Sequence, residues 1–322
     1  MLGPYVHHID PVIACVFGVC LWWYGLSYTL GFLTAHRLIT GRSGNLGLSL
    51  TSVYDLSLLL VGGVLLGGRL VEVIFYEWPF YRDHLTLIPA VWLGGMATHG
   101  LLFGGLLGTW LFCRLRHQPF LRVTDALAIP AAFILGVGRI GNFIDGQIVG
   151  SVTTVWWAVK FPDAEGFRHP VVLYDGVKNL LIIPVLWYVT SRKPPTGLLT
   201  GLFLFLYAFF RIFIDVFREY PTSLLGLATG QVLNIGMALL GAVLIGLAWR
   251  HRWGRAEHGA GVARTRDAAG VAWRRLLFAV LLLFCLVIPS DWTQDVPERY
   301  GNRHPGLAHS ASYPRIDTAA KK

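Results

Sequence analysis

Long apolar blocks constrain this chain more than any other feature of its sequence. Each block is bounded by Arg, Lys, Trp or Tyr, and most contain about 20 residues, which is the length that a helix needs to cross a bilayer. Of the 322 residues, 54% are hydrophobic and only 14% are charged, whereas about a quarter of a soluble domain is charged. The blocks therefore predict an all-α, multi-pass membrane protein.

The predicted spans form a core of seven helices followed by one shorter apolar run. The seven lie near residues 11–35, 51–76, 88–113, 124–145, 171–190, 197–217 and 226–249. The fourth is rich in glycine, which predicts a broken or re-entrant segment. We take the run 276–289 as an eighth span, because Trp273 and Trp292 fit the two membrane interfaces. The predicted regions are a seven-span core (1–249), a basic segment (250–275) and a span with a tail (276–322).

The distribution of positive charge orients the predicted bundle. Loops on one side carry fourteen Lys and Arg residues, seven of them within 250–275, whereas loops on the other side carry four if the C-terminal tail is left out. Cytoplasmic loops are the ones enriched in Lys and Arg. This predicts an extracytoplasmic N-terminus, a cytoplasmic segment 250–275 and an extracytoplasmic tail. The topology accounts for the net charge of +9, so we expect no nucleic-acid partner.

The cysteines and the short motifs point to no cofactor. All four cysteines lie inside apolar blocks, which predicts neither a disulfide framework nor a metal site. They are Cys15, Cys20, Cys113 and Cys285. The sequence carries no P-loop, no GxGxxG followed by a strand and helix, and no HExxH motif. We therefore expect no nucleotide, no metal and no other cofactor.

Five predicted spans contain polar or ionisable side chains that a bilayer normally excludes. A charge at this depth costs several kcal/mol even on the lenient insertion scales, so such a group indicates a functional site. These side chains are Tyr24 in the first span, Arg69 and Glu72 in the second, His99 in the third, Arg139, Asn142 and Asp145 in the fourth, and Arg211, Asp215 and Arg218 in the sixth.

Five of these side chains share one predicted depth. Tyr24 and His99 lie about 11–13 residues from the outer ends of inward-running spans. Arg69, Arg139 and Arg211 lie about 6–7 residues before the outer ends of outward-running spans. At about 1.5 Å per residue, all five fall between the midplane and the outer surface. Independent structural ion pairs have no reason to share a level, so this pattern predicts one site.

Structural roles explain several of these groups when each is taken alone. Arg211, Asp215 and Arg218 follow an i, i+4, i+7 spacing and can form a self-neutralising helix face. Arg69 and Glu72 are a similar i, i+3 pair, and a single histidine or tyrosine commonly packs between helices. Transporters also place ionisable residues beside interrupted helices in mid-membrane. The residues alone therefore define a membrane site for an anionic ligand.

Arginines gathered at one level favour a phosphate, because the planar guanidinium matches two phosphate oxygens. At this depth, the phosphate of a phospholipid headgroup is the natural ligand. His99 is a candidate base, and Tyr24 and Asn142 are candidate orienting groups. With phosphate-clamping arginines, this set suits displacement at a carbon that carries a phosphodiester leaving group.

Several motifs resemble those of the prolipoprotein diacylglyceryl transferases. Residues 136–150 read GVGRIGNFIDGQIVG and resemble the family signature GRxxNFxNxExxG. Further matches follow in the family's order: DPVI and WYGLSYTLGF within 10–32, LGGRL at 66–70, MATHG at 96–100, HPVVLYD at 169–175, FRIFIDVFRE at 210–219 and GQVLNIGM at 230–237. The resemblance covers about residues 6–250, and so many short motifs in register make it specific.

The resemblance implies a multi-pass enzyme of the bacterial inner membrane that acts in lipoprotein biosynthesis. Such an enzyme moves the diacylglyceryl group of phosphatidylglycerol to the lipobox cysteine in the signal peptide of a preprolipoprotein. A thioether forms and glycerol phosphate leaves. By position, Arg139 and Arg211 hold the phosphate, Asn142 and Tyr24 orient the headgroup, and His99 activates the thiol.

Some positions depart from the family pattern. Gln147 and Asp175 each stand in place of Glu, Asp145 in place of Asn, and Val172 in place of Gln. We expect Asp145 to supply the acid that Gln147 cannot. The predicted phosphatidylglycerol-binding residues therefore include Arg69, Asp145, Gln147 and Asp215 besides Arg139, Asn142 and Arg211. The alternatives to a transferase are a divergent paralogue that binds phosphatidylglycerol without catalysis and a transporter for an anionic solute.

Overall fold

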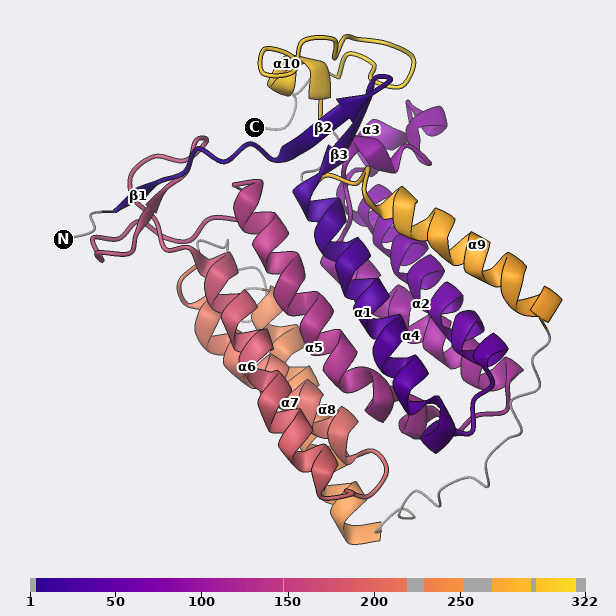
Figure 1. The fold of residues 1–322 in the computed structure, drawn as a ribbon. Helices are drawn as coiled ribbons and strands as arrows, with labels where there is room; N and C mark the ends of the chain where they lie inside the picture. The colour runs from indigo at the N-terminus through magenta and orange to yellow at the C-terminus, as the bar shows by residue number, and fades with distance from the viewer. Residues whose placement is uncertain (1–3, 147, 219–228, 252–267, 291–293, 317–322) are drawn as a thin grey trace.

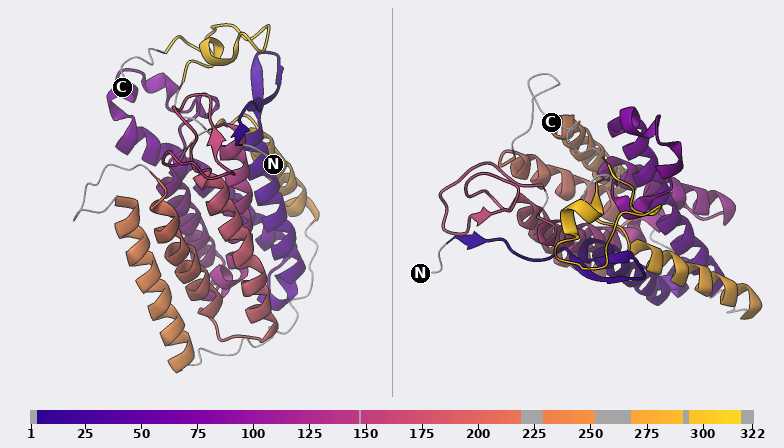
Figure 2. Two further views of the ribbon diagram at one scale, coloured as in Figure 1. Left: turned by 90° about the vertical axis from the view of Figure 1, so that its left-hand side faces the viewer. Right: turned by 90° about the horizontal axis from the view of Figure 1, so that it is seen from above.

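The computed structural model describes residues 4–146, 148–218, 229–251, 268–290 and 294–316 of the chain. Within these ranges, long helices run side by side as a bundle, and short strands, loops and two short helices cover one end of it (Figure 1). We call this end, which carries β2, β3 and α10, the capped end. The loops joining α1 to α2 and α6 to α7 lie at the opposite end (Figures 1 and 2).

The helices of the bundle are α1 (Trp23–Leu46), α2 (Leu50–Val71), α4 (Thr98–Leu115), α5 (Phe120–Ile144), α6 (Val171–Ser191), α7 (Leu198–Asp215), α8 (Thr229–His251) and α9 (Ala268–Cys285). A π-helical turn, Glu72–Tyr76, prolongs α2. The short elements of the capped end are α3 (Trp78–Tyr81), α10 (Val296–Tyr300), two 3-10 turns (Leu85–Leu87 and Val91–Leu93) and the strands β1 (Tyr5–Val6), β2 (Val12–Val16), β3 (Val19–Trp22) and β4 (Val159–Lys160).

Five helices in the described ranges are long and apolar enough to cross a membrane. They are Leu50–Tyr76, Phe120–Ile144, Val171–Ser191, Leu198–Asp215 and Gly230–Arg250. The remaining long helices pack among them, with α4 and α9 against α2 and α1 against α5 (Figure 1). The prediction of an all-α, multi-pass membrane protein is therefore confirmed in its main feature.

Glycines allow α2 and α4 to meet backbone to backbone. A Cβ atom at Gly104 would lie 1.9 Å from the carbonyl oxygen of Gly63. One at Gly67 would lie 2.4 Å from the carbonyl oxygen of Gly100. In lipid, helices gain little from hydrophobic burial, so close packing of small residues is a main source of their association.

Asp55 on α2 ties three helices together at the opposite end of the bundle. Its carboxylate accepts hydrogen bonds from Arg116, just after α4, and from Nε of Arg274 on α9. Asp55 is partly buried, and its two contacts place the first turns of α9 next to α2 and the end of α4. From there α9 runs toward the capped end (Figure 1).

The predicted span 11–35 is wrong in its first part, because residues 12–22 form a β-hairpin. Strands β2 and β3 pair antiparallel, and a disulfide links Cys15 to Cys20. Phe17 and Gly18 at the turn have φ of 51° and 78°, the two positive values that a tight hairpin turn requires. The expectation of no disulfide is therefore also wrong for this pair. Buried Cys113 and Cys285 are free thiols.

The predicted span 88–113 is helical only in its later part. The segment before α4 forms 3-10 turns and extended backbone, and Gly94 and Gly95 both have φ of 84°. Positive φ values are readily adopted by glycine but end a right-handed helix. As a result, His99 lies in the first turn of α4 instead of deep within a longer helix.

The predicted break in span 124–145 is wrong, because α5 is one continuous helix. Its glycines serve helix packing instead. A Cβ atom at Gly141 would lie 2.8 Å from Cα of Tyr24 in α1, and one at Gly136 would lie 2.7 Å from the side chain of Leu180 in α6. Glycine richness here reflects close contacts with two neighbouring helices.

The apolar run 276–289 contributes to α9, which starts earlier than predicted and ends at Cys285. Its first two turns come from the end of the predicted basic segment 250–275, so a span can use more chain than the apolar run alone. Residues 252–267 of that segment lie outside the described ranges.

The chain after α9 packs on the N-terminal hairpin at the capped end (Figure 2). The hairpin, the segment before α4 and the chain after α9 share one buried hydrophobic cluster. Its members are Val12, Cys20, Trp22, Ala90, Leu93, Val296, Tyr300, Leu307, Tyr313 and Ile316. The ring of Trp22 meets that of Tyr300 edge to face at 5.1 Å, and the hydroxyl of Tyr313 accepts a 3.3 Å hydrogen bond from the backbone N–H of Cys20. The hairpin and the tail therefore share one side of the bundle.

Candidate functional site

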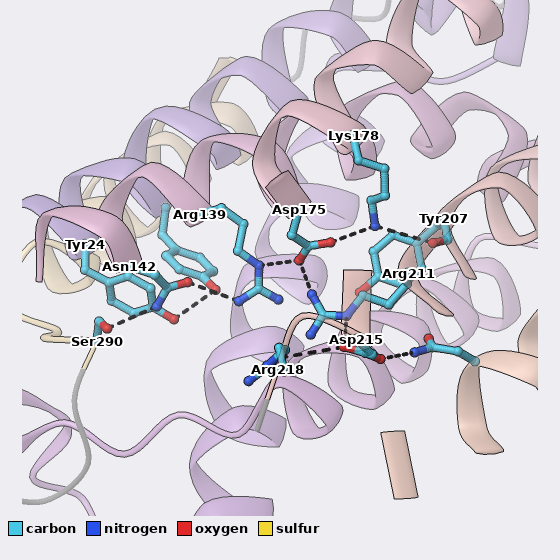
Figure 3. A network of polar contacts seen from close by, with 12 residues as sticks. Tyr24, Arg139, Asn142, Asp175, Lys178, Tyr207, Arg211, Asp215, Arg218 and Ser290 are labelled. Carbon is cyan, nitrogen blue, oxygen red and sulfur yellow. Dashed lines mark hydrogen bonds and ion pairs between the residues drawn. The ribbon is translucent and has the colours of Figure 1, made fainter. Parts of the chain in front are cut away.

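The last two turns of α5 present two polar side chains on one face. Arg139 and Asn142 are three residues apart, which places them on neighbouring positions of the helix surface. Their side chains are buried, and Nη1 of Arg139 donates a 3.1 Å hydrogen bond to Oδ1 of Asn142 (Figure 3). The pair begins a polar network that crosses from α5 to α6 and α7.

Asp175 is the centre of this network. It lies in the first turns of α6, is only 1% exposed, and accepts a 2.7 Å hydrogen bond from Nε of Arg139. The same oxygen, Oδ2, accepts from Nη1 of Arg211 on α7, and Oδ1 pairs with Nζ of Lys178 at 2.8 Å (Figure 3). A carboxylate this deeply buried needs such partners. It also fixes where both guanidinium groups point.

A second carboxylate holds Arg211 from its own helix. Nε of Arg211 lies 3.1 Å from Oδ1 of Asp215, and Nη1 of Arg218 lies 4.0 Å from the same oxygen. Nδ2 of Asn234 on α8 donates to Oδ2 of Asp215 at 3.1 Å. Arg211, Asp215 and Arg218 therefore form the ion-paired helix face that their spacing predicts. The same pairing helps to hold the side chain of Arg211 in the network.

Positive side chains outnumber the carboxylates that they contact in the described part of this network. Arg139, Lys178 and Arg211 meet around Asp175, and Arg218 joins Arg211 at Asp215. This local surplus of cations suits an anionic ligand, because buried charge is costly unless it is paired.

Tyr24 lies beside the network in the first turn of α1. It is 5% exposed, and its hydroxyl donates a 3.1 Å hydrogen bond to that of Tyr28. Gly141 on α5 lets the backbone of Tyr24 approach that helix closely. The side chain of Tyr24 is then near enough to Arg139 for the two to interact electrostatically. The expected association of Tyr24 with Arg139 and Asn142 is therefore present in the fold (Figure 3).

His99 approaches the same end of the bundle from α4. Its side chain is partly exposed, and Nδ1 lies 3.4 Å from the hydroxyl of Tyr76 in the π-helical turn. It is within electrostatic range of Arg211. Tyr24, His99, Arg139 and Arg211 thus all come from the first or last two turns of their helices at the capped end, as a shared level would require.

Arg69 is engaged by the segment that joins α2 to α4. Its Nε donates to the carbonyl oxygen of Ile88 at 2.7 Å, and Nη2 donates to that of Leu87 at 2.9 Å. Nη1 donates to Gly95 at 3.3 Å, and the guanidinium lies 5.0 Å from the ring centre of Tyr81. Arg69 therefore satisfies backbone carbonyls of an irregular segment, which is a structural task apart from the phosphate role predicted for it.

The signature ends in a turn that contacts the C-terminal part of the chain. Asp145 caps α5, and its Oδ2 accepts a 2.9 Å hydrogen bond from the backbone N–H of Ser290. The side chain of Ser290 accepts a 3.0 Å hydrogen bond from Nδ2 of Asn142. Gln147, a predicted binding residue, lies outside the described ranges.

Several residues of this network were not among the predicted site residues, and Asp175, Lys178 and Ser290 make the most contacts with those that were. Asp175 entered the sequence argument only as a departure from a family motif, and Lys178 did not enter it. An i, i+3 pair of opposite charges within the otherwise apolar block 171–190 was the available signal. Ser290 has no comparable signal, because its partners lie 145 and 148 positions away along the chain.

An open cavity of about 420 Å³ lies next to the signature turn. Its lining residues are Gly146, Ile148, Val149, Asp163, Ala164 and Arg299. Arg299, from the C-terminal tail, is ion-paired with Asp163. The signature, the loop after it and the tail therefore share one hollow at the capped end.

The fold and the network together define a multi-pass membrane protein with a buried arginine pair near one membrane face, suited to an anionic headgroup. The sequence matches the model of the prolipoprotein diacylglyceryl transferase family over residues 11–247. It is 40% identical over 256 residues to the phosphatidylglycerol–prolipoprotein diacylglyceryl transferase of Mannheimia succiniciproducens, covering 76% of this chain and 94% of that protein. The chain therefore belongs to the prolipoprotein diacylglyceryl transferase family.

Other relatives carry the same description. The enzyme of Geobacter sulfurreducens is 38% identical, with 77% of this chain and 98% of the relative covered. That of Photorhabdus laumondii is 35% identical over 280 residues, with 78% and 96% covered. The resemblance inferred from short motifs is confirmed, and the transferase family displaces the anion transporter as the interpretation of the buried arginines. The family match ends before α9.

Proposed function

We propose that this chain transfers the diacylglyceryl group of phosphatidylglycerol to the lipobox cysteine of preprolipoproteins. The cysteine sulfur attacks the glyceryl carbon that carries the phosphate, a carbon–sulfur bond forms, and the carbon–oxygen bond breaks. The electron pair of that bond leaves with glycerol phosphate. The observation that carries the proposal is the pair Arg139 and Arg211, held on one buried carboxylate oxygen in a chain of this family.

The arginine pair supplies the electrostatic part of the reaction. Negative charge on the phosphate grows as the carbon–oxygen bond breaks, so fixed donors stabilise the transition state more than the bound lipid. Asp175 keeps both guanidinium groups in place before the lipid arrives. Little reorganisation is then needed when charge develops.

The remaining predicted residues receive roles from their positions. Asn142, which is linked to Arg139, and Tyr24, which packs against α5, orient the headgroup. His99 takes the thiol proton, since it faces the same end from α4 and is partly exposed. Asp145 supplies a carboxylate next to the position of Gln147.

We assign the capped end to the extracytoplasmic side of the bacterial inner membrane, with seven core spans and α9 as an eighth crossing. The hairpin disulfide supports this orientation, because disulfides persist in oxidising compartments. The excess of Lys and Arg in the loops of the opposite end supports it as well. In this orientation the lipid and the signal peptide reach the site from the outer leaflet.

The direct test uses the purified full-length protein, phosphatidylglycerol labelled in its acyl chains, and a lipobox peptide. Transfer predicts a peptide heavier by one diacylglyceryl group and an equal amount of released glycerol phosphate. A peptide with the lipobox cysteine replaced by serine is the control and should gain no label. Binding of phosphatidylglycerol without any transfer would instead identify the non-catalytic paralogue.

A further inference from the structure

We infer that the chain after α9 completes the active site, with Ser290 as a positioning residue for Asn142 and Asp145 of the signature. The inference rests on the proposed transferase function and adds a residue to its site. The family match ends at residue 247, and the alignments already cover 94% and 98% of two relatives. The few residues that remain in those relatives cannot supply a counterpart of α9 and the tail.

The end of α9 is fixed against α1 by backbone contacts. The carbonyl oxygen of Cys285 lies so close to α1 that a Cβ atom at Gly25 would be 2.2 Å from it. The N–H of Trp22 donates to the carbonyl oxygen of Leu286 at 2.9 Å. Two backbone contacts at successive residues set the register in which the chain leaves α9, just before Ser290.

Ser290 contacts the signature through both its side chain and its backbone. Its Oγ accepts from Nδ2 of Asn142 at 3.0 Å (Figure 3), and its N–H donates to Oδ2 of Asp145 at 2.9 Å. The two partners are one helical turn apart at the end of α5. Ser290 therefore bridges the residue that orients the headgroup and the residue that replaces the family's asparagine.

The chemistry of the neighbours fixes the direction of the Asn142 amide. Arginine can only donate, so Arg139 requires the amide oxygen of Asn142 on its side. The NH₂ group then points to Oγ of Ser290, which accepts. Removing that acceptor leaves a buried N–H group without its partner and frees the amide to rotate away from Arg139.

The departure at position 145 fits the same contact. Asp145 stands where the family has asparagine, and a carboxylate is an acceptor only. A backbone N–H donating to a carboxylate forms a stronger bond than one donating to an amide oxygen. One hydrogen bond therefore joins Ser290, in the chain after α9, to Asp145, the signature residue that departs from the family pattern.

The tail beyond Ser290 is itself anchored. Asp295 caps α10 by accepting from the N–H of Glu298 at 3.0 Å, and its carboxylate also accepts from the N–H of Ile316 at 3.2 Å. The hydroxyl of Tyr313 accepts a hydrogen bond from the backbone N–H of Cys20 in the hairpin. A serine held between an anchored helix end and an anchored tail is in a position to act on the signature.

The test compares Ser290→Ala, Ser290→Thr and a matched control, Ser310→Ala, in the full-length protein. Ser310 lies in the same tail, where its Oγ accepts from the N–H of Tyr313 at 3.3 Å. We expect Ser290→Ala to lower kcat/KM for phosphatidylglycerol about three- to tenfold, the range of one hydrogen bond. Ser290→Thr keeps the hydroxyl and should stay within about twofold of wild type. Ser310→Ala should equal wild type, and the KM for the lipobox peptide should not change in any variant.

Binding of phosphatidylglycerol is measured on the same variants, so that Ser290 is tested independently of turnover. Weaker binding or slower transfer by Ser290→Ala alone supports the inference. Equal values for Ser290→Ala and wild type in both assays overturn it, as does an equal loss in Ser290→Ala and Ser310→Ala. A wild-type protein that binds the lipid but transfers nothing refutes the proposed function and still leaves the binding comparison to decide the role of Ser290.

Discussion

One buried carboxylate, Asp175, fixes the orientation of two arginines, Arg139 and Arg211. Because Asp175 pairs with Nε of Arg139 and with Nη1 of Arg211, both guanidinium planes are set before any ligand binds. Lys178 shares the charge of that carboxylate from the other oxygen. The two guanidinium groups are therefore prearranged forks, a geometry that suits the oxygens of an anion such as a phosphodiester.

At the residue scale, we predict that the charge on Asp145 is required. Asp145→Asn keeps the shape and the acceptor atom but loses a charge-assisted hydrogen bond, so transfer should fall about tenfold. Adding Gln147→Glu restores the family pattern and should recover much of the rate. Initial transfer rates with saturating peptide measure both. Asp83→Asn, at an exposed carboxylate of the same end, is the control and should leave the rate unchanged.

An active Asp145→Asn variant would show that the signature acid is dispensable here. A double variant that exceeds a nearly inactive wild type would instead favour the non-catalytic paralogue. The outcomes differ in the wild-type rate, so one set of measurements separates them.

How far the site could be predicted depended on how local its signals are. Arg139 and Arg211 stand in motifs and in apolar blocks, where a charge is conspicuous. Asp175 also stands in a motif, but its meaning comes from two other helices that converge on it. The contacts of Ser290 depend on the path of α9, which no local pattern specifies.

At the scale of single elements, glycine positions determine which helices can touch. We predict that Gly104→Ala separates α2 from α4, because its Cβ would meet the backbone of Gly63. Overpacking of this kind costs about 1–3 kcal/mol, so the Tm should fall by at least about 3 °C. Gly62→Ala, on the same helix pair with nothing within 4 Å, is the matched control and should leave the Tm unchanged or slightly higher. Equal shifts in a thermal unfolding assay of the detergent-purified variants would contradict the packing argument.

The predicted spans were least accurate where an apolar block does not form a helix. Residues 12–22 are apolar enough for a span, but the disulfide, the turn at Phe17 and Gly18, and the contacts with the tail favour a hairpin. The start of α4 depends on the glycines before it and on Arg69. This arginine lies on α2 and donates to backbone carbonyls of the segment that precedes α4. Such choices depend on distant partners, whereas α2, α6 and α7 follow their local apolar pattern closely.

At the scale of the whole molecule, the cap links the two ends of the described chain. The hairpin and the tail share a hydrophobic cluster, and α9 joins the opposite end of the bundle to this cap (Figure 1). The N-terminal hairpin and the tail must therefore lie on the same side of the membrane. This constraint is independent of the charge count in the loops, and the two agree.

We predict that a C-terminal alkaline phosphatase fusion to the full-length chain is active and that a β-galactosidase fusion at the same point is not. The reason is that α9 carries the tail to the capped end, which we assign to the extracytoplasmic side. Fusions placed directly after His251, at the end of α8, should give the reverse pattern. Strong β-galactosidase activity at the C-terminus would show that α9 does not cross.

The most direct test of the account is the transfer rate of Arg139→Lys and Arg211→Lys with labelled phosphatidylglycerol and a lipobox peptide. Lysine keeps the charge but cannot reproduce the planar fork that Asp175 holds, so each variant should lose at least about 100-fold. Arg114→Lys, an exposed arginine at the opposite end of α4, serves as the control and should transfer at the wild-type rate. Near wild-type transfer by either Arg139→Lys or Arg211→Lys would contradict the claim that these two side chains grip the phosphate.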